Sequence, residues 1–337
     1  MKKIIISTIT ISILFFTSCI KEIDGPIVIP TSSFPKIEIP LVDDISGSYY
    51  KKAYYNLETK TIVKSSYSKD WFIAFNSNPN NNFQKVILNY GFSKACNGFT
   101  LKDTNFFEIK KEDIFLDNTR YYANFYDNFA TLFQDNFDNL SSKKYVYYAI
   151  FDEKGMFKIQ ILDYTATSVT FRYASLNNSV YKEVTIPLAP NQNYTYFSFE
   201  TNAVADIEPS DKSTWDIEFT RYTTFITDFG SPQMYTVSGA LFNPSKSIQS
   251  TYIQNEKIEN INLQKTTNLI YSDSLDGIGY SWKIYSNAGA DGFYTIAPRV
   301  YIMKNTGKTY VLQFIEYSKL INNVNVRGYP TFLQNSL

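Results

Sequence analysis

The strongest constraint on the fold is that the sequence repeats itself at a spacing of 142 to 153 residues. Residues 54–59 (YYNLET) are echoed by 196–201 (YFSFET), and residues 69–75 (KDWFIAF) are echoed by 213–219 (STWDIEF). A third pair of segments, near the end of each copy, contains two alternating runs separated by a glycine-bearing loop. The matches occur in the same order, and the period is far too long for a solenoid. The sequence therefore predicts a duplicated domain.

Each copy carries the alternating pattern of β-strands. With 28 tyrosines and 27 phenylalanines, the chain is rich in residues that favour strands. In residues 157–164, Phe157, Ile159 and Ile161 alternate with more polar side chains, which is typical of a half-buried strand. The sequence NTGK at residues 305–308, between two alternating runs, predicts a hairpin turn. These patterns predict an all-β, mostly antiparallel fold.

The repeat also gives the domain boundaries that we expect. A divergent N-terminal β-domain is predicted for residues 49–180 and a C-terminal β-domain for residues 181–337. Trp71 and Trp215 occupy equivalent positions in the two copies. Because both lie in alternating runs, we expect each to anchor the core of its own copy. Residues 127–140 have apolar side chains at the spacing of one short helix.

The N-terminus has the pattern of a bacterial lipoprotein, although a plain signal peptide or a short membrane anchor is an alternative. Lys2 and Lys3 precede an apolar stretch that is too short to span a membrane, and Cys19 follows it after small residues. We predict a signal peptide over residues 1–18 and a diacylated Cys19, because two acyl chains suffice for stable anchoring. Regularly spaced prolines favour an extended tether over residues 19–48. The expected location is the outer membrane, lipid-anchored and facing the cell exterior.

The chain contains no histidine, which excludes several classes of site. Ser-His-Asp and Cys-His nucleophilic centres, and zinc or iron sites with histidine ligands, are not available to it. The 32 basic and 32 acidic side chains balance, and no basic block suggests a nucleic-acid partner. With Cys19 lipidated, Cys96 would be a lone thiol. These observations predict a protein that is not an enzyme and does not bind nucleic acid.

Four segments of the second copy form a combination that is more specific than any one of them. They are residues 196–201 (YFSFET), 213–222 (STWDIEFTRY), 235–243 (YTVSGALFN) and 301–317. Together they resemble the HmuY-like haemophore lipoproteins, over residues 181–337 and, more weakly through the repeat, back to residue 49. The resemblance implies two tandem HmuY-like units in a lipid-anchored surface protein. Such a protein captures haem and passes it to an outer-membrane receptor, which we expect to be TonB-dependent.

The resemblance also implies where haem ligands would lie. In the family one histidine lies in a Ser-His-Gly turn, where this sequence has YSNAG with Asn287 at the ligand position. The other lies in a variable loop, here within residues 252–273, which contain neither His nor Met. Met234 lies in a predicted Gly/Pro loop after the Trp215 strand and is our candidate for an iron ligand, although a tyrosinate can also ligate ferric haem. Tyr222 and Tyr285 flank the expected pocket and complete the set of candidate ligand-binding residues.

Two further groups of residues have structural interpretations. Met156 and Met303 fall in predicted hairpin strands, where packing is their expected role. Asp216 and Glu218 would share one strand face. A carboxylate pair can serve glycoside hydrolysis, but a structural ion pair at the end of a strand is the simpler interpretation.

The expected function is that of a surface-exposed binding protein for haem or another planar hydrophobic ligand, with both family histidines absent. The alternative is a structural or partner-binding surface lipoprotein that has lost haem binding. The first copy has Phe72 where the second has Asp216. We therefore expect the first copy to be a spacer or a docking module.

Overall fold

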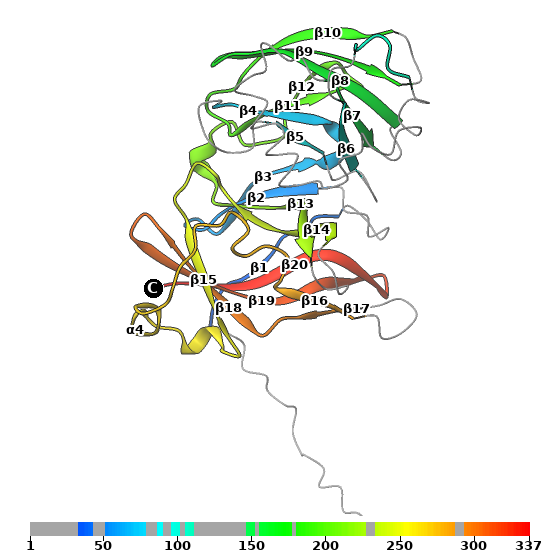
Figure 1. The fold of residues 1–337 in the computed structure, drawn as a ribbon. Coiled ribbons are helices and arrows are strands. Elements are labelled where there is room, and N and C mark those ends of the chain that lie inside the picture. The colour runs from blue at the N-terminus through cyan, green and yellow to red at the C-terminus, as the bar shows by residue number, and fades with distance from the viewer. Residues whose placement is uncertain are drawn as a thin grey trace, which may run out of the picture. The chain divides into compact units, whose positions relative to one another are not determined.

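The fold comes from a computed structural model, drawn in Figure 1. It describes residues 33–42, 51–78, 86–89, 96–101, 105–110, 146–151, 155–176, 180–226, 233–286 and 293–337. Cys19, Asn287 and the helix predicted for residues 127–140 lie outside these residues. The chain divides into Met1–Ser33 and a compact unit, Phe34–Leu337, which contains the contacts given below.

The described residues form antiparallel β-structure, which confirms the predicted fold class. The strands are β1 (Lys36–Glu38), β2 (Lys51–Asn56), β3 (Thr61–Tyr67), β4 (Ile73–Asn76), β5 (Val86–Leu88), β6 (Cys96–Leu101), β7 (Val146–Phe151), β8 (Gly155–Tyr164), β9 (Ser168–Ser175), β10 (Lys182–Pro187), β11 (Tyr194–Ser198), β12 (Ala203–Ala205), β13 (Ile217–Ile226), β14 (Gln233–Phe242), β15 (Gln249–Gln254), β16 (Lys283–Ser286), β17 (Phe293–Ile296), β18 (Arg299–Asn305), β19 (Lys308–Ile321) and β20 (Val324–Ser336). The helical segments are η1 (Ser68–Asp70), η3 (Lys212–Thr214), η4 (Ile258–Asn260) and α4 (Leu263–Thr266). Within the described ranges, no helix has the length and apolarity that crossing a membrane requires.

One β-sandwich is built mainly from the first copy of the repeat. Its two sheets have the strand orders β10-β9-β8-β7-β6 and β12-β11-β4-β5. Apolar side chains from both sheets form one buried cluster, in which Phe75 and Phe171 have ring centroids 5.0 Å apart. Full burial of such a side chain stabilises the fold by about 1.5–3 kcal/mol. The cluster therefore holds the two sheets together.

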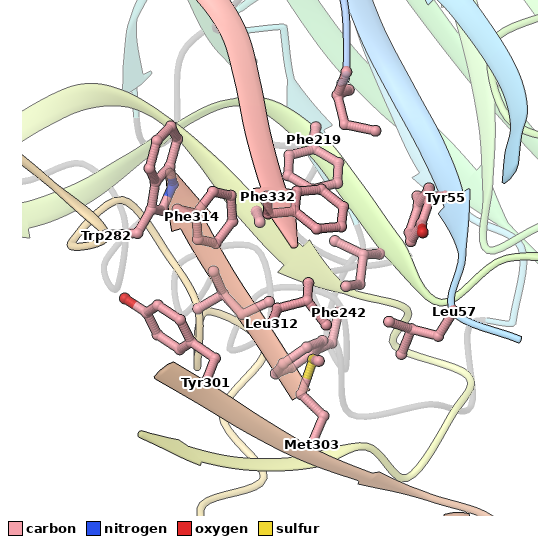
Figure 2. Packing of buried hydrophobic residues seen from close by; sticks show 14 of the residues in the cluster. Tyr55, Leu57, Phe219, Phe242, Trp282, Tyr301, Met303, Leu312, Phe314 and Phe332 are labelled. Carbon is pink, nitrogen blue, oxygen red and sulfur yellow. The ribbon is translucent and has the colours of Figure 1, made fainter. Parts of the chain in front are cut away.

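A second β-sandwich is built mainly from the second copy. Its sheets have the strand orders β1-β20-β19-β18-β15 and β14-β13-β2-β3. Figure 2 shows the buried cluster that joins them, in which Phe219 of β13 stacks on Phe332 of β20 at a centroid distance of 5.9 Å. Trp282 stacks on Phe314 of β19 at 4.3 Å. Met303 is fully buried in the same cluster, which confirms the packing role expected of it.

The sheets do not follow the two copies of the repeat. The hairpin β2–β3 belongs to the first copy but lies in one sheet with β13 and β14 of the second. The hairpin β11–β12 belongs to the second copy but lies in one sheet with β4 and β5 of the first. The boundary between residues 180 and 181 separates the two copies in the sequence, and as a domain boundary it stays a prediction. Both four-stranded sheets contain strands from either side of that boundary.

The two repeat tryptophans pack differently from the prediction. Both are buried, but neither belongs to the core of its own sandwich. Trp71 packs edge-on against Tyr196 at 4.9 Å, and Trp215 packs edge-on against Tyr54 at 5.0 Å. Each tryptophan therefore contacts a tyrosine of the other copy. The prediction that each anchors its own core is wrong. The hairpins β2–β3 and β11–β12 are exchanged between the two copies, and this hairpin exchange places each tyrosine beside the opposite tryptophan.

Two local predictions from strand patterns had different outcomes. The hairpin between β18 and β19 is confirmed, and Thr306 and Gly307 have φ angles of 47° and 80°. Two successive left-handed residues are what a type I′ turn requires. The prediction that residues 157–164 form a half-buried strand is wrong in one respect, because Lys158 on the polar face of β8 is also buried. Residues 105–110 cover this face, and the Lys158 ammonium donates to the Phe106 carbonyl at 2.7 Å.

The end of the predicted tether is part of the fold. Strand β1 pairs with the C-terminal strand β20, and Ile39 and Leu41 just after it are buried. Pro35 and Pro40 flank this three-residue strand at the edge of its sheet, where a missing N–H is tolerated. The extended tether predicted for residues 19–48 is therefore wrong for residues 36–41.

Candidate functional site

A buried lysine marks the candidate site. Lys283, the first residue of β16, is only 7% exposed. Its ammonium lies over the rings of Trp282, Tyr317 and Tyr294, at 4.6, 5.0 and 5.9 Å from the ring centroids. It also donates a hydrogen bond to the carbonyl of Ser238 in β14. Because β17 carries Tyr294 and β19 carries Tyr317, four strands converge on one positive charge.

The surroundings of Lys283 disfavour its charged form. Burial lowers the pKa of the Lys283 ammonium to about 7, because the group loses its contact with water. The aromatic faces and the Ser238 carbonyl offset part of this cost, since a desolvated cation–π contact contributes about 2 kcal/mol. The amine can therefore change its charge near neutral pH.

Tyrosine rings connect this lysine to the surface. Tyr285 of β16 is 48% exposed, and its ring centroid lies 5.1 Å from that of Tyr294. Tyr294 in turn lies 5.1 Å from Tyr317, whose hydroxyl is 3.0 Å from the Ser238 hydroxyl. We call Tyr285, Tyr294 and Tyr317 the tyrosine row. It presents one partly exposed aromatic face and leads inward to Lys283.

The structure places the other predicted residues as follows. Tyr222 in β13 is buried, and the backbone at Gly239 and Gly279 passes close to its ring. A Cβ atom added at Gly239 would lie 3.0 Å from Cε1 of Tyr222, and one added at Gly279 would lie 3.1 Å from its hydroxyl. Met234 lies within strand β14, opposite Phe225, and not in the loop predicted for it. Their roles in ligand binding, like that of Asn287, stay predictions.

Asp216, one of the two carboxylates considered for catalysis, connects separate strands. It accepts hydrogen bonds from the Leu57 amide at 2.7 Å and from Asn305 Nδ2 at 2.9 Å. Its other partner is the Lys246 ammonium at 2.6 Å. Since Asp216 is 3% exposed, these contacts are buried and support its structural interpretation.

Glu218, the second carboxylate, forms a different buried ion pair. It lies 2.6 Å from the Lys52 ammonium of β2, and their side chains are 15% and 5% exposed. The same ammonium lies 5.1 Å from the ring centroids of Trp71 and Tyr196. Asp216 and Glu218 thus have separate partners and form no catalytic pair. The described part of the chain holds no cluster of three or more metal-ligating side chains.

Four residues of the site were not predicted from the sequence: Trp282, Lys283, Tyr294 and Tyr317. A lysine in a strand is usually expected to face solvent. The signal that could have identified Lys283 is its position between the aromatic residues Trp282 and Tyr285, in a strand that ends near the predicted ligand turn. That signal is weak without the partner strands β17 and β19.

Comparison with known proteins gives the family of this region. A family model described as HmuY protein matches residues 190–333. This part of the chain is HmuY-like. The match confirms the predicted resemblance and includes the tyrosine row together with Lys283. Residues 51–67, which form β2 and β3 and complete a sheet of the HmuY-like part, lie outside the match.

Two solved structures also match parts of the chain. A candidate lipoprotein of Bacteroides fragilis is 12% identical, with a TM-score of 0.23, over 52% of this chain and 91% of that one. A candidate HmuY-like haem-binding protein of Bacteroides vulgatus is 16% identical, with a TM-score of 0.17, over 42% of this chain and 82% of that one. No curated protein sequence matches the chain. The HmuY-like assignment rests on the family match.

Proposed function

We propose that this protein is a surface-exposed binding protein that captures haem or another planar hydrophobic ligand at the tyrosine row. A lipid on Cys19 would hold it on the outer membrane, facing the exterior. A TonB-dependent outer-membrane receptor would take the ligand from it. Capture and transfer need no bond to be made or broken in the ligand, so the protein would not be an enzyme.

The observation that carries this proposal is the exposure of Tyr285 within the HmuY-like part. About half of this side chain is open to solvent, while Tyr294 supports its ring from 5.1 Å away. An aromatic surface that is open on one side can stack on a planar macrocycle. Lys283 places a positive charge behind the row, which favours a ligand that carries carboxylates.

Coordination of a haem iron would differ from that of the family, because the chain has no histidine. Met234 is the predicted ligand, and a tyrosinate from Tyr285 is the alternative. Stacking and buried area would then supply most of the affinity.

A haemin titration of the full chain, followed by the Soret band, tests this proposal. We expect a saturable change, and about tenfold weaker binding for Tyr285→Ala, since one aromatic contact is worth about 0.5–1.5 kcal/mol beyond its buried area. Tyr181→Ala is the matched control, because Tyr181 is 45% exposed but lies next to β10 of the first sandwich. Equal loss in both variants would contradict a site at the tyrosine row. A Soret change that survives Met234→Ala removes that residue as the iron ligand.

The lipid anchor is tested separately. Labelling of growing cells with a radioactive fatty acid should mark the wild-type chain and not Cys19→Ser. The substituted chain should also leave the membrane fraction. A labelled Cys19→Ser chain would contradict the anchor.

The absence of histidine favours a second candidate function, a structural or partner-binding surface lipoprotein that has lost haem binding. This function predicts that the wild-type protein leaves the Soret band of added haemin unchanged. In that case Tyr285→Ala and Tyr181→Ala would also behave alike.

A further inference from the structure

The exchange of hairpins follows a two-fold symmetry of the repeat. In one sheet, Tyr54 of β2 lies opposite Glu218 of β13. In the other sheet, the equivalent residues Tyr196 of β11 and Ala74 of β4 lie opposite each other. The two pairings therefore share one register, as the two halves of a symmetric dimer do.

The exchanged hairpins also meet along the symmetry axis. Residues that the repeat makes equivalent contact each other there. The hydroxyls of Tyr54 and Tyr196 are 3.4 Å apart. The Lys64 ammonium lies 2.5 Å from Oδ1 of Asp206, at the same offset of 142 residues. A symmetric arrangement of this kind is what hairpin swapping between two identical units would produce.

The same symmetry provides a competing arrangement. Because the hairpins occupy equivalent positions, each hairpin and the strand before it could pair within its own copy. Strand β1 would then pair with β9 in place of β20, and β10 with β20 in place of β9. Hairpin strand β2 would pair with β4, and β11 with β13. The backbone register would be identical, so backbone hydrogen bonds do not select between the two arrangements. Side chains that differ between the copies must select, as in other cases where a sequence disfavours an alternative structure.

The ion pair between Lys52 and Glu218 distinguishes the two arrangements. In the exchanged form their charged atoms are 2.6 Å apart and nearly buried. In the unexchanged form, the repeat would place Lys52 beside Ala74 and Glu218 beside Tyr194. Two buried charges would then each lack the opposite charge, which is strongly destabilising.

A buried hydrogen bond distinguishes them in the same direction. The Tyr55 hydroxyl donates to Gln334 Oε1 at 2.6 Å, and Gln334 Nε2 donates to the Leu57 carbonyl at 2.6 Å. The residue equivalent to Tyr55 is Phe197, which lies in the phenylalanine-rich core of the first sandwich. Unexchanged pairing would put Phe197 beside Gln334 and bury the Tyr55 hydroxyl in an apolar core. Both changes leave polar groups unsatisfied.

We propose that the pairs Lys52–Glu218 and Tyr55–Gln334 select the exchanged arrangement and so interlock the two copies into one folding unit. The HmuY-like part is then incomplete without residues 51–67. The first copy is an integral part of the second sandwich, and not a spacer. This inference does not depend on the ligand.

Cleavage between the copies tests the interlocking. A protease site inserted between Val180 and Tyr181, both exposed, separates the chain after β9 and before β10. We expect residues 1–180 and 181–337 to elute together from a sizing column in native buffer and to separate only in denaturant, because β1 pairs with β20 and β10 pairs with β9. Two folded fragments that separate in native buffer would overturn the inference.

Moving the selecting residues to the other hairpin tests their role. The chain with Lys52→Tyr, Tyr55→Phe, Tyr194→Lys and Phe197→Tyr should fold unexchanged, so that its cleaved fragments separate in native buffer. Fragments that stay together in this variant would show that other residues select the arrangement.

A charge exchange keeps the inference testable if that variant does not fold. Lys52→Glu should lower the midpoint of urea unfolding of the intact chain by about 1 M. Adding Glu218→Lys should restore most of the loss, because the two positions are adjacent only in the exchanged form. No restoration would contradict the selection by this pair.

Discussion

Two buried lysines of this protein have similar aromatic surroundings and different electrostatic ones. Lys52 lies within 6 Å of the ring centroids of Tyr54, Trp71 and Tyr196, and Lys283 lies within 6 Å of those of Trp282, Tyr294 and Tyr317. Lys52 has a carboxylate partner, Glu218, at 2.6 Å. The pKa of Lys283 is lowered because its buried ammonium loses contact with water.

The difference shows what a carboxylate adds to an aromatic lysine site. A buried ion pair holds two strands of different copies together. Removing one partner destabilises the fold because the other charge stays buried. An ammonium held by rings and a carbonyl loses its charge more readily and responds to pH. The first arrangement suits a structural contact, and the second suits a binding site.

Removing the carboxylate should have the largest effect on stability. Glu218→Gln leaves the Lys52 charge buried without its partner and should lower the free energy of unfolding by about 3–5 kcal/mol. Urea unfolding followed by circular dichroism measures this change. The control is Glu316→Gln, which removes an ion pair to Lys36 whose side chains are about half exposed. It should cost about 0–1 kcal/mol, and equal costs for the two variants would contradict the comparison.

The lysine of the candidate site should produce a stability that rises with pH. Its folded pKa of about 7 is below the 10.5 of an exposed lysine, so between these values the folded state binds fewer protons than the unfolded state. The free energy of unfolding should therefore increase by about 4 kcal/mol from pH 7 to pH 10.5. Lys283→Met should lose this increase. An unchanged pH dependence in the variant would contradict the lowered pKa of the buried ammonium.

A buried acid near Lys52 should produce a smaller effect of opposite direction. Burial raises the pKa of Glu208 to about 7, although the amides of Asn193 and Tyr194 donate to it at 3.0 Å. Between pH 4.5 and 7 the folded state binds more protons, so the free energy of unfolding should fall by about 2 kcal/mol as pH rises. Glu208→Gln keeps an acceptor for these amides and should remove the fall. A variant that retains it would show that another group titrates.

The sequence predicted local structure better than the pairing of strands. Alternating runs and the Asn-Thr-Gly turn identified the β18–β19 hairpin, because Gly307 and its neighbour determine that turn locally. The hairpin exchange was not predicted, since both arrangements have the same register. The choice between them depends on Lys52 and Glu218, which are far apart in the sequence.

The candidate site was predicted only in part for a similar reason. Tyr285 was identified from its place near the family's ligand turn. Lys283 was missed because its burial depends on rings from β17 and β19, which no pattern within β16 reveals. Tyr222 was predicted to flank the pocket, and that role stays a prediction. The close approach of Gly279 to its hydroxyl comes from a distant loop, which no pattern near Tyr222 reveals.

Quenching of Trp282 fluorescence by haemin tests ligand capture at this site most directly, because Trp282 contacts Lys283 beneath the tyrosine row. In the full chain with Trp71→Phe and Trp215→Phe, Trp282 is the remaining tryptophan of the three. Haemin should quench its emission to saturation at one equivalent, and Tyr285→Ala should shift the titration to higher haemin concentration. Emission that haemin leaves unchanged would contradict capture of haem at the tyrosine row.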